Sequence, residues 1–528
     1  MKHTYDYVII GSGFGGSVSA LRLAEKGYSV LVLEKGKWFK SDDFPKSNWN
    51  LKKWLWEPRA RLFGFFKMTY LNHVTILSGV GVGGGSLTYA NTLPIPKKKF
   101  FNSGSWANLC DWERVLKPYY KEAHRMLGAT VNPILGPADQ LIKDLSRTLK
   151  REKFFSHTKV AVHFEDSGQT VKDPYFNGKG PNRNGCVQCG ACMTGCRYNA
   201  KNTLDKNYLF LAQQLGTEIL AEKEVYDVIP LDGDRGASGY NVYYKGSTKR
   251  SNKMKVQAGA VIFSGGVIGT VPLLLKLKAK NSLPYLSDQL GCNIRTNNES
   301  LLVLTSTEKN KDYTKGIAIG SILDIDENSH LEPVRYGKGS SFFKMLTIPS
   351  IQHKWMVFRI LGILSVVITN PVELIKTIFK KRYSRSTIIL LFMQTLDSTL
   401  CLKLGKITQL KTSTESGEKP SGIIPIASRL AKILGHKIKA IPYANFTDVL
   451  LGTPTTAHVL GGAVMGSDTA NGVINGDNRV FGYENMLICD GSMISANPGV
   501  NPALSITAIS EYAMSKIPSK QKKELADN

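Results

Sequence analysis

The stretch from Tyr5 to Gly36 constrains the fold of this chain more than any other. Residues 7–10 form an apolar run typical of a buried strand, and a second such strand is expected at 30–33, ending on Glu34. Between them, apolar residues recur at helical intervals. The turn that opens this helix holds three glycines at the spacing G-x-G-x-x-G: Gly11, Gly13 and Gly16. The order of elements predicts parallel strands joined by a helix, and therefore an α/β domain.

This glycine turn is typical of a dinucleotide-binding site. Gly11 allows the tight turn, Gly13 lets the backbone approach a pyrophosphate, and Gly16 lets the helix pack against the strand. Glu34 can accept hydrogen bonds from a ribose hydroxyl and would repel a 2′-phosphate, which argues against NADP. The alternative is a glycine-rich turn in an unrelated strand–helix–strand unit.

Length and charge bound the remaining possibilities. A chain of 528 residues predicts two large domains, and a formal charge of +26 favours a negatively charged partner such as a membrane surface or an acidic substrate. We find no motif that reads DNA or RNA, so no nucleic-acid partner is expected. The first strand begins within a few residues of Met1, which leaves no room for a secretory signal. We therefore expect a cytoplasmic protein, with peripheral membrane contact as a further expectation.

Four of the eight cysteines crowd into eleven residues at the spacing C-x2-C-x2-C-x3-C: Cys186, Cys189, Cys192 and Cys196. This is the spacing of a bacterial iron–sulfur run, although Arg197 replaces the usual proline and the fourth cysteine of such runs serves a second cluster. One cluster would use the first three thiolates with either the fourth or a distant one: Cys110, Cys292, Cys401 or Cys489. Zinc is a rival, and a loop of reduced thiols is a third interpretation.

Two apolar segments each allow two interpretations. Residues 41–69 interleave aromatic and basic side chains, which suits either a membrane-facing loop or a lid whose aromatics pack inward. Residues 355–371 are too short and too interrupted for a membrane span, so we expect either a buried helix lining an apolar cavity or a helix lying in a membrane surface. The basic segment that follows, to Arg385, is either a solvated face or a membrane contact.

Two further regions carry signals of ligand binding. A glycine-rich loop at 79–85 brings backbone amides close to a ligand. Near the C-terminus a buried strand ends at Asp490-Gly491, and Asn501 before Pro502 is placed as the cap of a helix over 502–516, whose N-terminus could stabilise an anionic reduced cofactor. His458 precedes a glycine pair; by itself a lone histidine is more often structural.

These motifs together resemble the glucose–methanol–choline (GMC) oxidoreductases, and within them the bacterial cholesterol oxidase branch. The matching pieces cover roughly half of the chain: GSGFGG with Glu34, GVGVGGGSL, SGGVIGT, HVLGG, and RVFGYENMLICDGS leading to NPGVNPALSITA. The resemblance implies an α/β fold, α+β overall, in which a Rossmann-type FAD-binding domain is paired with a substrate domain of antiparallel sheet and helices.

The predicted domains are discontinuous. The FAD-binding domain is expected from residues 1–40, 70–100, 180–302 and 453–528, and the substrate domain from residues 101–179 and 303–452, with 41–69 as the lid or membrane-facing loop.

The resemblance also assigns site residues. His458 stands in the H-x-x-G-G context of the family's active-site histidine, and Asn501 matches the asparagine of its G-x-N-P motif. Asp490 matches the acid at the strand end near FAD, and Val225 the residue that contacts adenine through its backbone. The cofactor contacts expected are Gly11, Gly13, Gly16, Glu34, Gly79, Gly83, Gly84, Gly85, Ser86, Val225, Asp490, Gly491, Asn501 and Pro502. His353 stands where some relatives have the glutamate with which they isomerise their product, so the resemblance does not imply that step here.

The resulting hypothesis is an FAD-dependent oxidation of an apolar alcohol, such as a 3β-hydroxysterol, with O2 or an unknown carrier as the electron acceptor. His458, with Asn501, would bind the hydroxyl and accept its proton, while hydride passes to flavin N5. One alternative is a flavin dehydrogenase that passes electrons through an iron–sulfur cluster to a membrane acceptor. Another is a non-catalytic, lipid-binding flavoprotein.

Overall fold

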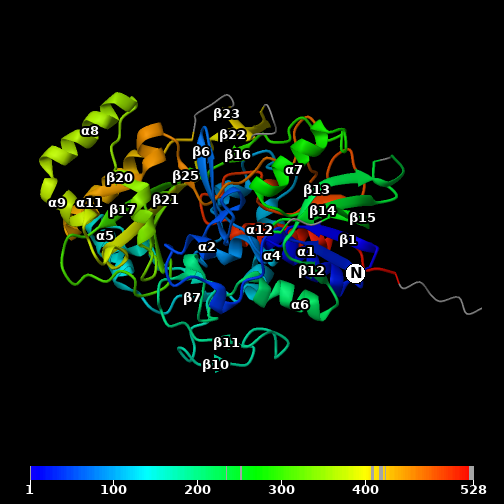
Figure 1. The fold of residues 1–528 in the computed structure, drawn as a ribbon, viewed down its shortest axis with the longest axis horizontal. Coiled ribbons are helices and arrows are strands. Elements are labelled where there is room, and N and C mark those ends of the chain that lie inside the picture. The colour runs from blue at the N-terminus through cyan, green and yellow to red at the C-terminus, as the bar shows by residue number, and fades with distance from the viewer. Residues whose placement is uncertain are drawn as a thin grey trace, which may run out of the picture.

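Two seven-stranded sheets organise the chain, shown in a computed structural model that describes residues 2–233, 235–249, 252–405, 410–414, 420–422 and 424–521. They lie side by side in Figure 1, the first around β1 and the second around β17. The architecture is the mixed α/β fold expected from the sequence. The predicted domain boundaries remain predictions, and residues 522–528 of the last predicted segment lie outside the described residues.

The first sheet has the order β12-β2-β1-β15-β14-β13, with β26 also paired to β15. Its strands are β1 (Thr4–Ile10), β2 (Val30–Leu33), β12 (Glu218–Leu220), β13 (Lys223–Pro230), β14 (Tyr240–Gly246), β15 (Met254–Phe263) and β26 (Met486–Ile488). β1 runs parallel to β2 and β15, and Ile10 is in register with Leu33 and Phe263. The carboxyl ends of these strands therefore meet at one edge, where an α/β sheet binds its ligand.

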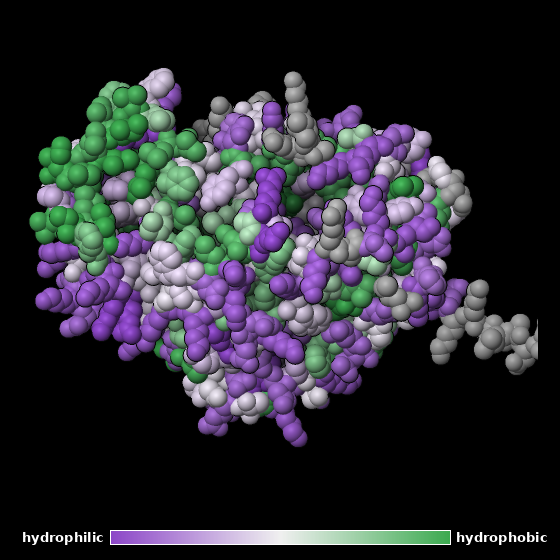
Figure 2. Space-filling model, viewed as in Figure 1, coloured by the Kyte–Doolittle hydropathy of each residue, from purple (hydrophilic) through white to green (hydrophobic). Residues whose placement is uncertain are grey.

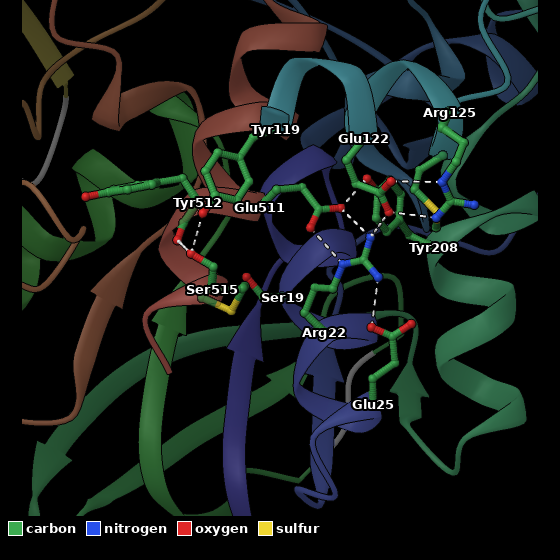
Figure 3. Close-up of polar contacts among 12 residues, drawn as sticks. Ser19, Arg22, Glu25, Tyr119, Glu122, Arg125, Tyr208, Glu511, Tyr512 and Ser515 are labelled. Carbon is green, nitrogen blue, oxygen red and sulfur yellow. Dashed lines mark hydrogen bonds and ion pairs between the residues drawn. The ribbon is translucent and has the colours of Figure 1, made fainter. Parts of the chain in front are cut away.

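Four helices pack together beside this sheet through a shared ion-pair network (Figure 3). They are α1 (Phe14–Glu25), α4 (Trp112–Met126), α6 (Tyr208–Gln214) and α12 (Ala503–Ser515). Arg22 of α1 lies at 2.7 Å from Glu511 of α12 and 2.6 Å from Glu122 of α4. The Tyr208 hydroxyl donates to Glu511 at 2.6 Å. The ion pair between Arg22 and Glu511 thereby joins α1, which follows the glycine turn, to a helix almost 500 positions later in the chain.

The second sheet is antiparallel, with the order β20-β24-β17-β21-β19-β18-β8. Its strands are β8 (Phe155–His157), β17 (Ser300–Thr305), β18 (Ser321–Asp324), β19 (Ser329–Val334), β20 (Thr347–Pro349), β21 (Thr387–Gln394) and β24 (Pro442–Asn445). One face packs against α5 (Pro137–Thr148) and α11 (Pro425–Ile438) in an apolar core. Because strand residues alternate between faces, the register places Glu332, Leu391 and Leu301 on the other face.

Smaller elements complete the fold. The short sheets contain β3 (Trp56–Glu57), β4 (Leu62–Phe63), β5 (Phe66–Leu71), β6 (Val74–Gly79), β7 (Thr130–Val131), β9 (Lys159–Val160), β10 (Thr170–Val171), β11 (Arg183–Asn184), β16 (Ile294–Arg295), β22 (Thr399–Leu404), β23 (Leu410–Thr414) and β25 (Thr455–Thr456). The remaining α-helices are α2 (Leu51–Trp54), α3 (Lys98–Phe101), α7 (Val267–Ala279), α8 (Met356–Thr369), α9 (Pro371–Ile378) and α10 (Tyr383–Ser386).

The two apolar segments behave differently from each other. Most aromatics of residues 41–69 pack inward in a cluster with Phe342 and Phe343. The role of this segment as a lid or a membrane-facing loop stays a prediction. The expectation of a buried helix at 355–371 is wrong, because Arg359 is the one buried residue of α8. In the described part of the chain, no single helix has the length and apolarity to cross a membrane, although α8 and α9 pass that test as a pair bent by 93°.

Candidate active site

The glycine turn after β1 has the close packing that its sequence predicts. Gly11 has a φ of +104°, and a Cβ there would lie 2.4 Å from the carbonyl oxygen of Ser264 at the end of β15. A Cβ on Gly16 would lie 2.1 Å from the carbonyl oxygen of Gly11. Gly13 is the N-cap of α1, and no side chain caps that helix end. The first amides of α1 are thus placed for an anionic group such as a pyrophosphate.

The glycine-rich loop after β6 lies directly on this turn. A Cβ on Gly84 would approach the Cα of Gly13 to 2.7 Å, and Gly84 has a φ of +52°. Ser12 joins the two segments, since its hydroxyl donates to Glu34 at 2.8 Å and accepts from the Gly83 amide at 3.1 Å. Residue-type reasoning missed Ser12, which stands between two of the motif glycines. The turn at residues 11–16 and the loop at residues 79–85 thus form one unit, which we call the glycine cradle.

Other predicted loop residues shape the cradle through contacts within the protein. Ser86 donates to the Gly83 carbonyl at 2.7 Å and accepts from the Leu204 amide at 3.1 Å. Gly79 lies against the backbone of Gly84, and Gly85 follows in the short helical turn that ends at Leu87. In these contacts Ser86 and Gly79 hold the loop in shape.

Glu34 directly follows β2 and contacts the glycine turn. Its carboxylate accepts from the amides of Ser12 at 3.1 Å and Gly36 at 2.8 Å, and its carbonyl accepts from Lys223 at 2.8 Å. The last bond brings the start of β13 to this edge of the sheet, where the strand is irregular just after Val225. Val225 therefore lies on the strand that begins beside Glu34.

Asp490 connects the end of β26 to the start of α7. Its carboxylate accepts from the amide of Gly266 at 2.8 Å and the hydroxyl of Thr270 at 2.5 Å. Burial raises the pKa of this carboxyl. The next residue, Gly491, accepts from the Gly461 amide at 2.9 Å, which ties the strand end to the His458 segment.

His458 is held by a buried carboxylate from the second sheet. Its Nδ1 lies 2.6 Å from Oε2 of Glu299, whose Oε1 accepts from the Ala457 amide. The backbone amide of His458 donates to the Thr456 hydroxyl at 2.9 Å. Because a carboxylate only accepts, Nδ1 carries the proton and Nε2 is left as an acceptor. Burial lowers the pKa of His458, but the charge and hydrogen bond of Glu299 and the charge of Glu332 outweigh it, so the pKa is raised.

Asn501 faces the second sheet and is not the predicted helix cap. Its Nδ2 lies 3.4 Å from Oε2 of Glu332, and its Oδ1 has no partner among the described atoms. The helix α12 begins at Ala503 with Pro502 as its N-cap, one residue later than predicted. Because its side-chain amide turns toward Glu332, Asn501 does not cap α12. Its side chain is therefore available for contact with a ligand.

Glu299 and Glu332 are the residues that sequence reasoning missed. Both side chains are fully buried, and Glu332 also lies 3.5 Å from Nε2 of His330. Neither lies in a short sequence motif, because their partners His458 and Asn501 stand 159 and 169 positions away. The available signal was a single acid within an otherwise strand-like run.

The four clustered cysteines line one small cavity together with Lys201. Burial raises the pKa of Cys189 to about 11 and also raises the pKa of Cys186 and Cys192. Over the described ranges no group of three or more histidine, cysteine or acidic side chains is placed to hold a metal ion. The predicted iron–sulfur cluster is therefore unsupported, and the zinc alternative with it.

The distant thiols do not join this cavity. Cys292 and Cys401 approach each other at 2.7 Å, Cys489 is buried in the core of the first sheet, and Cys110 is half-buried just before α4. The ammonium of Lys201 instead donates to the carbonyls of Leu87, Tyr89 and Cys192 at 2.8 to 3.0 Å. The cysteine loop is thus tied to the glycine-rich loop.

Comparisons with known proteins identify the family of this chain. Residues 5–296 and 436–510 match the two family models described as GMC oxidoreductase. A cholesterol oxidase of Acinetobacter baumannii is 43% identical over 98% of this chain and 95% of its own length. A cholesterol oxidase of Mycobacterium tuberculosis is 40% identical over 98% and 92%.

Solved structures share the fold at low sequence identity. A formate oxidase superposes with a TM-score of 0.64 at 13% identity, covering 97% of both chains. A pyridoxine 4-oxidase from Mesorbium loti superposes with a TM-score of 0.63 at 14% identity, covering 97% of this chain and 99% of that one.

Proposed function

This chain belongs to the GMC oxidoreductase family and is an FAD-dependent alcohol oxidoreductase, and from that premise we propose that it oxidises a 3β-hydroxysterol or a similarly apolar alcohol. The observation that carries the proposal is the position of the His458–Glu299 pair beside an apolar sheet face. The names of the relatives, which are cholesterol oxidases, support the same substrate class.

The residues present fit FAD. A Cβ at Gly11 would clash with the backbone of Ser264, and a Cβ at Gly84 with that of Gly13, so the glycines let these backbone segments pack closely at the uncapped start of α1. Glu34 would hold the ribose, Val225 the adenine, and Asp490, Gly491 and the start of α12 the flavin end. Bound FAD would supply the hydride acceptor for the carbinol carbon.

The protein's own part in the reaction is to bind the hydroxyl and take its proton. His458 Nε2 is the acceptor, and Glu299 fixes the ring through Nδ1 and stabilises the imidazolium that forms. Asn501 Nδ2, which donates one N–H toward Glu332, can donate its other N–H to the oxygen of the same hydroxyl. Burial of Glu299, Glu332 and Asn501 keeps bulk water from these groups.

A small, mainly apolar pocket lies on the face of the second sheet that also carries Glu332. Glu332 and Val334 share one face of β19, and Val334 lies opposite Ile389 of β21. Val334, Ile389 and Val303 line the pocket with the aromatic rings of Tyr336 and Phe343. A sterol has one hydroxyl and an apolar body, so a polar site and apolar side chains on one sheet face suit its chemistry.

Two alternatives are less well supported. The iron–sulfur dehydrogenase lacks a set of metal ligands within the described residues. We propose O2 as the electron acceptor because the relatives are cholesterol oxidases. A non-catalytic lipid-binding flavoprotein would have no use for a buried histidine held by a carboxylate. We further propose that the enzyme is cytoplasmic and contacts the membrane peripherally.

The test is anaerobic mixing of the purified, FAD-loaded protein with alcohols while flavin absorbance is followed. Cholesterol should bleach the flavin, whereas the matched hydrocarbon without the 3-hydroxyl should not. Bleaching by short alcohols alone would contradict the sterol proposal. If no alcohol bleaches the bound flavin, the lipid-binding alternative would hold instead.

A further inference from the structure

The surface of α8 and α9 is unlike the surface of the rest of the described chain. Thirteen of the 28 large apolar side chains that are exposed lie between Trp355 and Phe379. Figure 2 shows them as one hydrophobic area over α8 and α9, bordered by hydrophilic residues. Contiguous apolar surface of this kind marks an interaction site.

The helix α8 reverses the usual pattern of a surface helix. Its inward stripe is Arg359, Ile363 and Val366, spaced as i, i+4 and i+7, and Arg359 is its one buried residue. Most of the outward positions are apolar, and Leu361, Leu364 and Ile368 are 53%, 52% and 77% exposed. A surface helix in water places its polar residues outward, so this one is built for an apolar medium.

The charge around the helix pair specifies the partner. Between Lys354 and Arg385 the chain has seven basic residues and one acidic residue, Glu373. The exposed cations are Lys354, Lys376, Lys381 and Arg382. Apolar side chains surrounded by cations suit the interface of a bilayer that contains anionic lipid.

The geometry fits docking in one leaflet rather than a span. The 14 residues of α8 extend about 21 Å, against a hydrocarbon core of about 30 Å. The chain then bends by 93° into α9. We propose that α8 and α9 form a membrane-docking surface that inserts into the headgroup region of an anionic bilayer.

This surface adjoins the apolar pocket of the second sheet. Val366 of α8 and Leu374 of α9 pack with Val303, Tyr443 and Ile389. Val303 and Ile389 also line the pocket. Docking would therefore place the pocket beside the lipid, from which an apolar alcohol can enter; this last step rests on the proposed function, whereas docking itself does not.

Vesicle sedimentation with the full chain tests the proposal. Wild type should bind vesicles containing phosphatidylglycerol more strongly than pure phosphatidylcholine vesicles. The variant L361Q/L364Q/I368Q should lose at least about tenfold in partitioning. The variant K376Q/K381Q/R382Q should lose about fivefold for each cation removed, and only on anionic vesicles.

Matched controls separate this surface from general effects. V131Q/I134Q/L215Q removes exposed apolar groups elsewhere, K98Q/K117Q/K121Q removes exposed cations elsewhere, and both should bind as wild type. Flavin reduction by a cyclodextrin-delivered alcohol should be unchanged in every variant. Equal binding by wild type and L361Q/L364Q/I368Q would overturn the proposal. The proposal would also be overturned if the wild type bound no vesicles but formed a dimer, and if L361Q/L364Q/I368Q dissociated that dimer. If neither the wild type nor any variant oxidised the alcohol, that result would count against the proposed function and not against membrane docking.

Discussion

At the scale of single residues, the proposed chemistry depends on the pairing of His458 with Glu299. The imidazole must be neutral at Nε2 to accept a proton, and the neighbouring carboxylates raise its pKa. Activity should therefore fall as the pH drops through a value above the usual 6.5 of histidine.

Replacing Glu299 by glutamine tests this electrostatic role. The change removes the charge that raises the pKa of His458, so the acid limb of the kcat/KM profile should move to lower pH. The maximal rate should also fall by about tenfold or more, because the ring loses its orientation. E327Q, at an exposed position, is the control and should leave the profile unchanged. An unmoved limb in E299Q would show that Glu299 does not tune His458.

Asp448 gives a second prediction at this scale, for stability. Burial raises its pKa from 3.8 to about 7, so the folded state favours the protonated carboxyl. Stability should then decrease as the pH rises from about 4 to about 7, by about 1.4 kcal/mol per unit. D448N keeps an oxygen for the Thr455 hydroxyl and should remove this slope. Urea unfolding at pH 5 and pH 8 measures the free energy of unfolding of both proteins. If D448N changed that free energy equally at both pH values, the result would contradict the predicted role of Asp448.

At the scale of elements, Arg22 joins α1 to α12 and α4. R22M should destabilise the protein by about 3 to 5 kcal/mol, because it leaves Glu511 buried and without its cation. The matched change R125M removes an exposed partner of Glu122 and should cost under about 1 kcal/mol. Denaturant midpoints compare the two variants. If both variants lost similarly little free energy of unfolding, the ion-pair network would contribute little to stability.

Sequence patterns predicted those elements whose signal is local. The strand, glycine turn and helix at Tyr5–Gly36 were predicted because the tight packing of Gly11 and Gly16 leaves its mark in adjacent residues. The environment of α8 could not be predicted in the same way. An apolar run fits both a core helix and a membrane-surface helix, and here Arg359, its most polar residue, is the one that is buried.

At the scale of the whole molecule, the proposed active site lies where segments that follow the first sheet meet the start of β17 in the second. Bonds from Asn297 to Val500 and from Thr456 to Thr296 join the His458 and Asn501 segments to the start of β17. The family resemblance supplied His458 and Asn501, but Glu299 and Glu332 gain their roles only from the packing of distant segments. Sequence spacing alone therefore cannot identify them.

The central claim is that this assembly oxidises an apolar alcohol with His458 as the proton acceptor. The most direct measurement is the rate of flavin bleaching by cholesterol under anaerobic conditions in wild type and in H458N, with bound FAD quantified in both. The account predicts that H458N retains FAD and bleaches about 100- to 10,000-fold more slowly. Bleaching of FAD-loaded H458N at the wild-type rate would contradict it.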